Sequence, residues 1–415
     1  MRILHISTRL ILGGSQENTV LSCEEQARRG HDVHLAFGPI YGPEGSLLDR
    51  VRSFRTDDGR GITTHVVPHM VREVAPIKDA RAYRELRALV RAVEPGVVHT
   101  HSSKAGILGR LAAWDEGVAR VVHTIHGPPF MPAEGGALAR AKTRISNGVY
   151  TVAERFAAER CHAIVSVADA MTREFLQRGI GHPGLYATVR SGIEVDRYLG
   201  AVPGDDRASV RARLGLAPTD FVVGVVARLA QHKGHDDLLA ALAPRMRTEP
   251  SWKLLWVGDG WWRERLLARA RSLGLRVAEL DRGQSTPAQL LVSGLVPPER
   301  IPAMIRAMDV LAHPSSREGL PRTVPQALLC GVCPVAYDAD GTGEACREME
   351  TGRLVPVGDV GRLRDAVEWC AANPAERDRL ARAGRAWCAR EFSVAAMADG
   401  LERIYWPDRA VPANH

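Results

Sequence analysis

The stretch Arg2-Ile-Leu-His-Ile-Ser-Thr-Arg-Leu-Ile-Leu-Gly-Gly-Ser-Gln16 passes from a short apolar run through a glycine pair into the start of a helical pattern. Residues 2–7 have the length and composition of a buried strand, and residues 17–29 have the apolar spacing of an amphipathic helix. A strand that leads through a short loop into a helix is the repeating unit of α/β folds with a parallel sheet. We therefore predict this fold class for the start of the chain.

The same order of strand and helix recurs along the first half of the chain. Strands are predicted at residues 2–7, 31–37, 62–67, 97–101, 120–126, 163–167 and 186–190, and helices include residues 17–29, 80–93 and 104–114. Because these strands are apolar on both faces, they are expected to form a parallel sheet covered by helices on both sides.

A second series follows residues 196–206, where Gly200, Pro203 and Gly204 predict a linker. Its predicted strands are residues 221–226, 253–257, 289–295, 310–313, 333–338 and 353–356, and its helices include residues 235–242, 261–273, 302–307, 323–330 and 360–372. Residues 274–293 are predicted to form an insertion loop.

The length of the chain, 415 residues, is too great for one ordinary hydrophobic core. We therefore predict two Rossmann-like α/β domains, residues 1–198 and 199–395, with ligands at the carboxyl ends of their strands. A last helix within residues 396–415 is expected to cross back to the first domain.

The composition narrows the class of partner. The net charge of +7 favours anionic ligands such as nucleotide diphosphates or lipid head groups. Nucleic acid is disfavoured, because basic residues are spread over many helices and few aromatic side chains could stack on bases. The seven scattered cysteines are typical of a reducing compartment, and Cys330 and Cys333 are interpreted as packing residues because no second cysteine pair completes a metal site.

The apolar segments are too short to predict insertion into a membrane. No charged leader precedes a long apolar stretch, so no signal peptide is expected, and no window reaches about 18 uninterrupted apolar residues. We therefore expect a cytoplasmic protein. Residues 137–158 place basic residues among apolar ones, which predicts either a peripheral helix on an anionic membrane surface or an ordinary surface helix.

Three segments in the first half bring polar groups to predicted strand ends. Gly13 and Gly14 would let the backbone approach an anion at the start of a helix, although a plain tight turn is the alternative. His101 and Lys104 follow a buried strand, where Ser102 or Ser103 is expected to cap the next helix.

The third of these segments is Val122-His-Thr-Ile-His-Gly127. Its His126 ends a strand just before a glycine, which favours a functional role at the edge of the sheet. His123, within the strand, is interpreted as a packing residue.

Two segments in the second half carry basic and glycine residues after strands. Arg228 and Lys233 could together hold a diphosphate, the first as a planar fork and the second as a point charge, although a solvated loop is the alternative. Gly258 permits close approach of the backbone, and Asp259 is predicted to cap the next helix. Asp338-Ala-Asp340 is interpreted as turn chemistry rather than a metal site.

The segment Glu318-Gly-Leu-Pro-Arg-Thr-Val-Pro-Gln326 places a carboxylate just ahead of a helix that Pro321 is suited to begin. Glu318 could bind a ligand there, or simply complement the helix dipole. Gln326, further along the helix, could reach a neighbouring part of the same ligand.

Taken in order, these segments resemble the retaining GT-B glycosyltransferases of glycosyltransferase family 4, and the resemblance covers almost the whole chain. It implies two Rossmann-like domains facing across a cleft. It also implies that a UDP- or GDP-sugar donor binds mainly to the second domain and the acceptor mainly to the first, with retention of anomeric configuration. Such enzymes usually need no metal, so we expect neither a metal nor another cofactor.

The resemblance assigns a role to each matching residue. Arg228 and Lys233 would grip the diphosphate, Glu318 would hold hydroxyls of the donor sugar, and His126 would lie near the reacting centre; these four form the expected catalytic set. The expected donor site also includes Gly13, Gly14, Gly258, Gly319, Leu320 and Gln326. His101 and Lys104 would contact the acceptor.

Gln326 departs from the family pattern, which has Glu at this position to accept hydrogen bonds from ribose hydroxyls. Because the Gln carbonyl can still accept a hydrogen bond, we expect nucleotide binding to survive. The departure bears on the contact with the nucleotide ribose.

The implied reaction is transfer of a sugar to a hydroxyl of a glycan, a lipid-linked sugar or a small molecule, in polysaccharide or glycoconjugate biosynthesis. An epimerase or phosphorylase of the same architecture, and a non-catalytic nucleotide-sugar-binding protein of the same fold, are the alternatives. A NAD-binding protein is disfavoured because no G-x-G-x-x-G follows the first strand. The acceptor pocket is expected to depend on the loops at residues 38–46 and 128–136.

Overall fold

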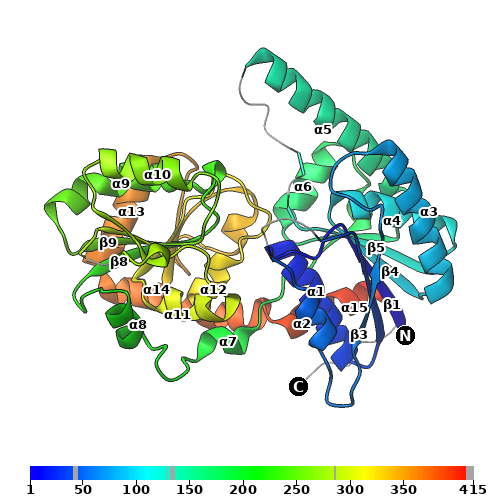
Figure 1. The fold of residues 1–415 in the computed structure, drawn as a ribbon, viewed down its shortest axis with the longest axis horizontal. Helices are drawn as coiled ribbons and strands as arrows, with labels where there is room; N and C mark the ends of the chain where they lie inside the picture. The colour runs from blue at the N-terminus through cyan, green and yellow to red at the C-terminus, as the bar shows by residue number, and fades with distance from the viewer. Residues whose placement is uncertain (41–44, 128, 131–135, 285–286, 408–415) are drawn as a thin grey trace. The chain divides into compact units, whose positions relative to one another are not determined.

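The computed structural model describes residues 1–40, 45–127, 129–130, 136–284 and 287–407. The chain forms two compact units, one of Met1–Ile193 with Val394–His415 and the other of Glu194–Ser393 (Figure 1). The acceptor pocket was predicted to depend on the loops at residues 38–46 and 128–136. Of these loops, residues 41–44, 128 and 131–135 lie outside the described residues, and so do residues 408–415 of the predicted last segment.

The first unit is built on a seven-stranded parallel sheet with strand order β3-β2-β1-β4-β5-β6-β7. The strands are β1 (Arg2–Ser7), β2 (Asp32–Phe37), β3 (Ile62–Val66), β4 (Val97–His101), β5 (Arg120–Ile125), β6 (Ala163–Ser166) and β7 (Tyr186–Thr188). The helices are α1 (Gly14–Arg28), α2 (Leu48–Ser53), α3 (Pro76–Val93), α4 (Ser103–Asp115), α5 (Ala137–Ala158), α6 (Asp169–Gln177), α15 (Val394–Tyr405) and the 3-10 turn η1 (Pro183–Leu185).

The second unit repeats this plan, with strand order β10-β11-β9-β8-β12-β13-β14. The strands are β8 (Phe221–Val226), β9 (Trp252–Val257), β10 (Val277–Glu279), β11 (Leu290–Val292), β12 (Val310–His313), β13 (Cys333–Tyr337) and β14 (Arg353–Val355). The α-helices are α7 (Val195–Leu199), α8 (Arg207–Arg213), α9 (His235–Thr248), α10 (Arg263–Ser272), α11 (Ile301–Arg306), α12 (Thr323–Leu329), α13 (Val360–Ala372) and α14 (Pro374–Glu391). The 3-10 turns are η2 (Gln231–Lys233), η3 (Leu280–Arg282), η4 (Pro298–Arg300) and η5 (Asp340–Glu344).

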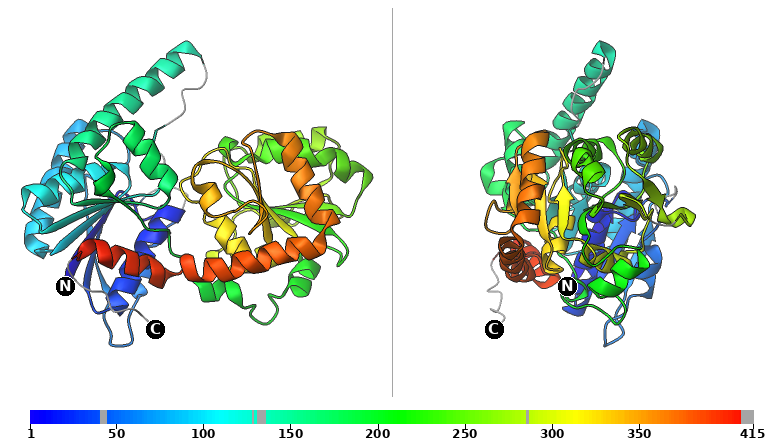
Figure 2. Two further views of the ribbon diagram at one scale, coloured as in Figure 1. Left: turned by 180° about the vertical axis from the view of Figure 1, so that it is seen from behind. Right: turned by 90° about the vertical axis from the view of Figure 1, so that its left-hand side faces the viewer.

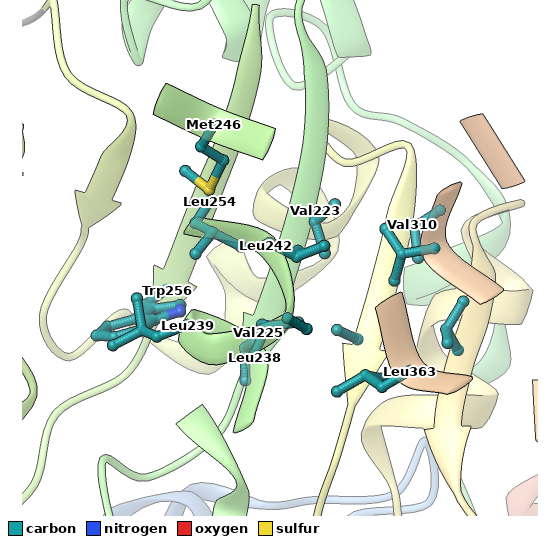
Figure 3. Close-up of a cluster of buried hydrophobic side chains, with 14 of the residues drawn as sticks. Val223, Val225, Leu238, Leu239, Leu242, Met246, Leu254, Trp256, Val310 and Leu363 are labelled. Atoms are coloured by element: carbon teal, nitrogen blue, oxygen red, sulfur yellow. The ribbon is translucent and has the colours of Figure 1, made fainter. Parts of the chain in front are cut away.

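Both sheets are parallel throughout, so the predicted α/β class is confirmed. Strands β1 and β8 are the first strands of their units, and each lies inside its sheet between two parallel neighbours. Their apolar side chains pack against helices. Figure 3 shows this for the second unit, where Leu238, Leu239 and Leu242 of α9 pack over β8 and β9. Each of these leucines is fully buried, which contributes about 1.5–3 kcal/mol per side chain.

The last helix, α15, belongs to the first unit. It lies alongside α1, as Figure 2 shows for the red and blue ends of the chain. Met397, Leu401 and Tyr405 of α15 pack in one cluster with Leu21 of α1 and the adjoining strands. The polypeptide therefore returns to its first unit after completing the second.

The chain passes from the first unit to the second after Ile193, five residues before the predicted boundary. The residues predicted as a linker instead form α7 and the loop that follows it, within the second unit. They are held there because Arg306 donates hydrogen bonds to the carbonyls of Tyr198 and Gly200. The glycine and proline residues mark a loop between two helices rather than the passage between units.

The prediction of an insertion loop at residues 274–293 is wrong. This segment contains β10, which forms the edge of the second sheet by pairing with β11, Val277 opposite Leu290. Arg263 of α10 anchors the segment through ion pairs with Glu279 and Asp281. Three residues, Val-Ala-Glu, are too short a run to be recognised as a strand; residues 285–286 lie outside the described residues.

Among the residues that the structure describes, no helix has the length and apolar character needed to cross a bilayer. Helix α5 extends well beyond the sheet of its own unit (Figure 1).

Candidate functional site

Each sheet has one point where the strand order reverses, between β1 and β4 in the first unit and between β8 and β12 in the second. In open parallel sheets, ligands bind outside the carboxyl ends of the strands at such a point. The candidate residues cluster after these four strands and after β5 and β9.

In the second unit, the structure joins Lys233 and Glu318. The Lys233 Nζ atom lies 2.5 Å from Glu318 Oε1, and His313 Nε2 lies 3.1 Å from the same oxygen. Burial alone would raise the pKa of the Glu318 carboxyl, but Lys233 and His313 outweigh burial and hold the pKa well below its usual value. Glu318 is therefore a charged carboxylate, most of it hidden from solvent, at neutral pH.

Two loops position this ion pair. Ser316 N and Ser315 Oγ, in the loop after β12, both donate to the carbonyl of His232, in the loop after β8. Gly234 has a φ of +70°, and a Cβ there would lie 1.9 Å from the carbonyl oxygen of Pro314. Only glycine fits where these two backbones pass so close to each other. The contact fixes the backbone position of Lys233, the residue before Gly234.

Arg228 does not share the partners of Lys233. Its side chain is exposed, and its guanidinium lies 5.5 Å from the ring centre of Trp261, which is itself exposed. The predicted diphosphate clamp is therefore divided in this structure into an accessible arginine and a lysine already neutralised by a carboxylate.

Gly258 and Gly260 pack the end of β9 onto the loop after β8. A Cβ on Gly258 would lie 2.2 Å from the carbonyl oxygen of Ala227, and one on Gly260 would lie 2.4 Å from that of Leu229. The prediction that Asp259 caps the next helix is wrong. Its carboxylate accepts from Gly260 N and pairs with Arg263, because two further residues separate it from the cap position of α10.

The segment after Glu318 is largely buried. Gly319 accepts a backbone hydrogen bond from Gly341, and Leu320 is 8% exposed. Gln326 is also buried, on a helix that begins at Thr323 rather than at Pro321. The Glu318 N–H donates to the Asp340 carboxylate. Asp340 itself has a positive φ in a turn, which agrees with the interpretation of Asp338-Ala-Asp340 as turn chemistry.

In the first unit, Gly13 and Gly14 are exposed at the start of α1, so their backbone is accessible. Ser102 occupies the cap position of α4, as predicted, but its hydroxyl does not cap the helix. It contacts Thr8 Oγ1 at 2.8 Å, and Thr8 Oγ1 instead accepts from Ala105 N. A residue from the end of β1 thus caps the helix after β4.

Thr8 and Ser102 border a cavity of about 610 Å³ within the first unit. Its lining includes Arg9, Arg72 and Lys104, together with apolar and aromatic side chains of α4 and α5 such as Ile107 and Tyr150. Lys104 bonds to Asp79 at 2.6 Å and to the carbonyl of Glu73. The cavity combines positive charge with apolar wall.

His101 lies behind His126 rather than on the surface. It is 1% exposed, and its Nδ1 atom lies 3.1 Å from Nε2 of the half-buried His126. Its burial favours action through His126 over direct contact with an acceptor. His123 is also buried, with Nδ1 3.0 Å from Thr100 Oγ1, which agrees with the interpretation of a packing residue.

Sequence reasoning missed His5, Gln26, His99 and Tyr405, which continue the polar cluster into the core. The signal for His5 and His99 was their alternation along β1 and β4 with Ser7 and His101. Nitrogen atoms of His5, His99 and His101 lie within 4.8 Å of one another, the one such group with metal-binding potential among the described residues.

Models of two families match the chain, one to each half. The model described as Glycosyltransferase Family 4 matches residues 12–197, and the model described as Glycosyl transferases group 1 matches residues 206–387. Together they span most of the sequence.

Curated relatives are similar over most of the chain. The UDP-Gal:alpha-D-GlcNAc-diphosphoundecaprenol alpha-1,3-galactosyltransferase of Escherichia coli is 26% identical over 88% of this chain and 87% of its own length. A D-inositol 3-phosphate glycosyltransferase of Segniliparus rotundus is 32% identical over 74% of this chain and 65% of its own length.

Solved structures share the fold. HepE of Anabaena in complex with UDP and glucose has a TM-score of 0.75 and 20% identity, covering 97% of this chain and 98% of its own. WaaG, a glycosyltransferase involved in lipopolysaccharide biosynthesis, has a TM-score of 0.69 and 16% identity, covering 97% and 99%. At these identities the similarity bears on the fold alone.

Proposed function

Since this chain is a glycosyltransferase of family 4 with the GT-B fold, we propose that it transfers a sugar from a UDP- or GDP-sugar to an acceptor hydroxyl with retention of anomeric configuration. The observation that carries this proposal is the charged group after β8 and β12: an accessible Arg228 stands on the same loop as Lys233, and Lys233 pairs with the largely buried Glu318 on the loop after β12. The E. coli relative is a UDP-Gal transferase and HepE was solved in complex with UDP, which makes UDP the first nucleotide to test.

The second unit would bind the donor. Arg228 offers a planar fork to the diphosphate, and Lys233 adds a point charge that neutralises the leaving group as the glycosidic bond breaks. Glu318, held charged, accepts hydrogen bonds from sugar hydroxyls through the oxygen lone pairs that Lys233 leaves unused. Gly258, Gly319, Leu320 and Gln326 would form the rest of this pocket.

The first unit would bind the acceptor. His126 would stand near the reacting centre, and the exposed backbone of Gly13 and Gly14 would approach the diphosphate. The cavity beside Lys104 suits an acceptor that has both an anionic and an apolar part. The acceptor named for the E. coli relative is a sugar on diphosphoundecaprenol, so we place a lipid-linked sugar ahead of a free glycan or a small molecule.

Helix α5 would hold the enzyme at a membrane surface as a peripheral contact. Five large apolar side chains are exposed along it: Leu138, Ile145, Val149, Val152 and Phe156. Their spacing of three, four or seven residues places them on one face of the helix. Arg140, Lys142 and Arg144 add positive charge, and a basic helix with one apolar face suits an anionic membrane.

The test is a thermal-shift screen of UDP, GDP and their sugars against wild type and Arg228→Ala. At about 100 times its dissociation constant, a bound donor stabilises the protein by about 2.7 kcal/mol. We expect one donor to stabilise wild type and to lose most of this effect in Arg228→Ala. Arg245→Ala is the matched control, because Arg245 lies about 15 Å along α9 from the site and pairs with Glu249.

A donor that stabilises wild type and Arg228→Ala equally would overturn the assignment of Arg228. If the stabilising donor is neither hydrolysed nor transferred, the chain is instead a nucleotide-sugar-binding protein of the same fold.

A further inference from the structure

A continuous line of hydrogen bonds runs from Gln26 to His126 through the core of the first unit. Gln26 Oε1 lies 2.7 Å from His5 Nε2, and His5 Nδ1 lies 2.9 Å from His101 Nε2. His101 Nδ1 lies 3.1 Å from His126 Nε2. Gln26 stands on α1, His5 on β1, His101 on β4, and His126 directly follows β5, so the line crosses the sheet at its reversal point.

The chemistry of the first member sets the direction of the line. An amide oxygen can only accept, so His5 Nε2 carries a proton and donates it. A neutral imidazole has one N–H, which leaves His5 Nδ1 as an acceptor for His101 Nε2–H. By the same reasoning His101 Nδ1 accepts from His126 Nε2–H. Each link is determined by the one before it.

Tyr405 holds the amide of Gln26 in this orientation. Gln26 Nε2 donates to the Tyr405 hydroxyl at 3.2 Å, and that hydroxyl donates to His99 Nδ1 at 2.5 Å. His99 Nε2 then donates to Thr124 Oγ1 at 2.6 Å. This side branch pairs both ring nitrogens of His99 without a second proton on the ring.

Burial keeps His5, His99 and His101 neutral. It lowers the pKa of His5 to about 4 and holds the pKa of His99 and of His101 well below the usual value. Tyr405 from α15 contacts His99, and His123 from β5 acts on His101. The charged groups next to these two are Arg110 of α4, which acts on His123, and Glu402 of α15, which acts on Tyr405. Among the residues that the structure describes, no carboxylate acts on His5, His99 or His101, so an imidazolium at these three rings would lack a counter-charge.

We propose that Gln26 is a positioning residue that acts through His5 and His101 to fix His126 in its Nε2–H tautomer. The Nδ1 atom of His126 then has a lone pair, so that it accepts from a sugar hydroxyl rather than donating to it; this role of His126 rests on the proposed function. The line orients the ring and does not conduct protons, because it ends in an amide that cannot hold one.

A bound metal would require a different arrangement. His5, His99 and His101 have six ring nitrogens, and each of the six is already paired with a hydrogen-bonding atom. The 2.9 Å between His5 Nδ1 and His101 Nε2 suits a shared proton. A metal ion bound to these rings would use the nitrogen lone pairs that now accept hydrogen bonds, and those hydrogen bonds could then no longer fix the tautomer of His126.

The test is nitrogen NMR of the full chain labelled with ¹⁵N-histidine, in which protonated and unprotonated ring nitrogens have well-separated shifts. His126→Asn identifies the His126 signals. In wild type at pH 7 we expect the Nε2–H form in about tenfold excess, a ratio that one hydrogen bond supplies. In Gln26→Leu the two tautomers should become roughly equal, while the His34 and His65 pair on β2 and β3 keeps its signals as an internal control.

Tyr405→Phe provides a second variant that keeps the packing of α15. Without the hydroxyl the Gln26 amide can turn over, so we expect a mixture of tautomers again. The proposal is overturned if wild-type His126 is an imidazolium or carries its proton on Nδ1, if both variants keep the wild-type tautomer, or if elemental analysis finds a metal bound to these rings.

This readout needs no substrate. If the tautomer is as expected and no donor binds, the proposed function fails and the inference stands. If a donor binds and is turned over while the tautomer differs, the inference alone fails.

Discussion

Replacing Lys233 by methionine removes the ammonium group that faces Glu318 and keeps most of the aliphatic stem. Glu318 would then be a buried carboxylate with His313 as its remaining polar partner. Breaking a buried ion pair from one side costs about 3–5 kcal/mol. Because the Lys233 side chain is 19% exposed and that of Glu318 is 13% exposed, we expect the lower end, about 3 kcal/mol. For a unit of this size, that loss corresponds to a fall of about 6–12 °C in Tm.

The assay is calorimetric unfolding of four proteins: wild type, Lys233→Met, Glu318→Gln and the double variant. Glu318→Gln leaves the lysine partly solvated, so it should cost less, about 1 kcal/mol. The double variant buries no lone charge and should cost less than the sum of the two singles, by about 2 kcal/mol. Lys253→Met is the matched control, because the Lys253 ammonium donates to a backbone carbonyl, that of Ala288.

The pH dependence of the cycle follows from the same pair. The pKa of Glu318 is depressed in the folded state, so its contribution to stability is present above the unfolded pKa of about 4.5 and is lost as pH falls below it. Lys233→Met should instead gain stability relative to wild type on mild acidification, since protonation removes its lone buried charge. If the costs of the two single variants add up to the cost of the double variant within about 0.5 kcal/mol, the two side chains do not interact and the reasoning is refuted.

Three further outcomes are expected. Gly234→Ala should lower the free energy of unfolding by at least about 2 kcal/mol in urea titrations, because its Cβ would overlap the Pro314 carbonyl at a positive φ; a loss below about 0.5 kcal/mol would contradict that crossing. The first unit should lose stability as pH falls from 6.5 towards 4, by about 3 kcal/mol for His5 alone, because the unfolded imidazole binds a proton that the buried one refuses; a flat profile in this window would contradict the neutral histidines. The double variant Val149→Glu, Val152→Glu should lose most binding to anionic vesicles in a sedimentation assay while keeping its Tm, since both side chains are about two-thirds exposed; equal binding would exclude α5 as the membrane contact.

The sequence was sufficient for the fold class and for most of the strands that carry the site. Apolar runs such as residues 97–101 and 310–313 became strands with the same bounds, because a strand buried on both faces has few other ways to bury its side chains. Strand β10 was not predicted because an edge strand needs only one paired neighbour and can be short and polar.

The partners of site residues could not be predicted in the same way. Lys233 and Glu318 were each identified, yet their pairing across 85 positions depends on β8 lying beside β12, which no local pattern encodes. The line through His5 needs the register of β1 on β4, in which His5 faces His99 and Ser7 faces His101. It also needs α15 to bring Tyr405 into the core from the far end of the chain.

Buried polar groups are stabilised differently at the two reversal points. In the first unit, imidazole, amide and hydroxyl groups satisfy one another without charge, so a change in one hydrogen bond alters the orientation of the next and leaves the electrostatic field almost unchanged. In the second unit, Lys233 and Glu318 keep full charges close together, and a ligand that draws on one of them must change the field at the other. A diphosphate that binds Lys233 would free Glu318 for uncharged hydroxyl groups, so a nucleotide diphosphate should strengthen the binding of the sugar next to it. Calorimetric titration of the free sugar with and without UDP measures this coupling directly, and equal affinities would show that the two charges act independently.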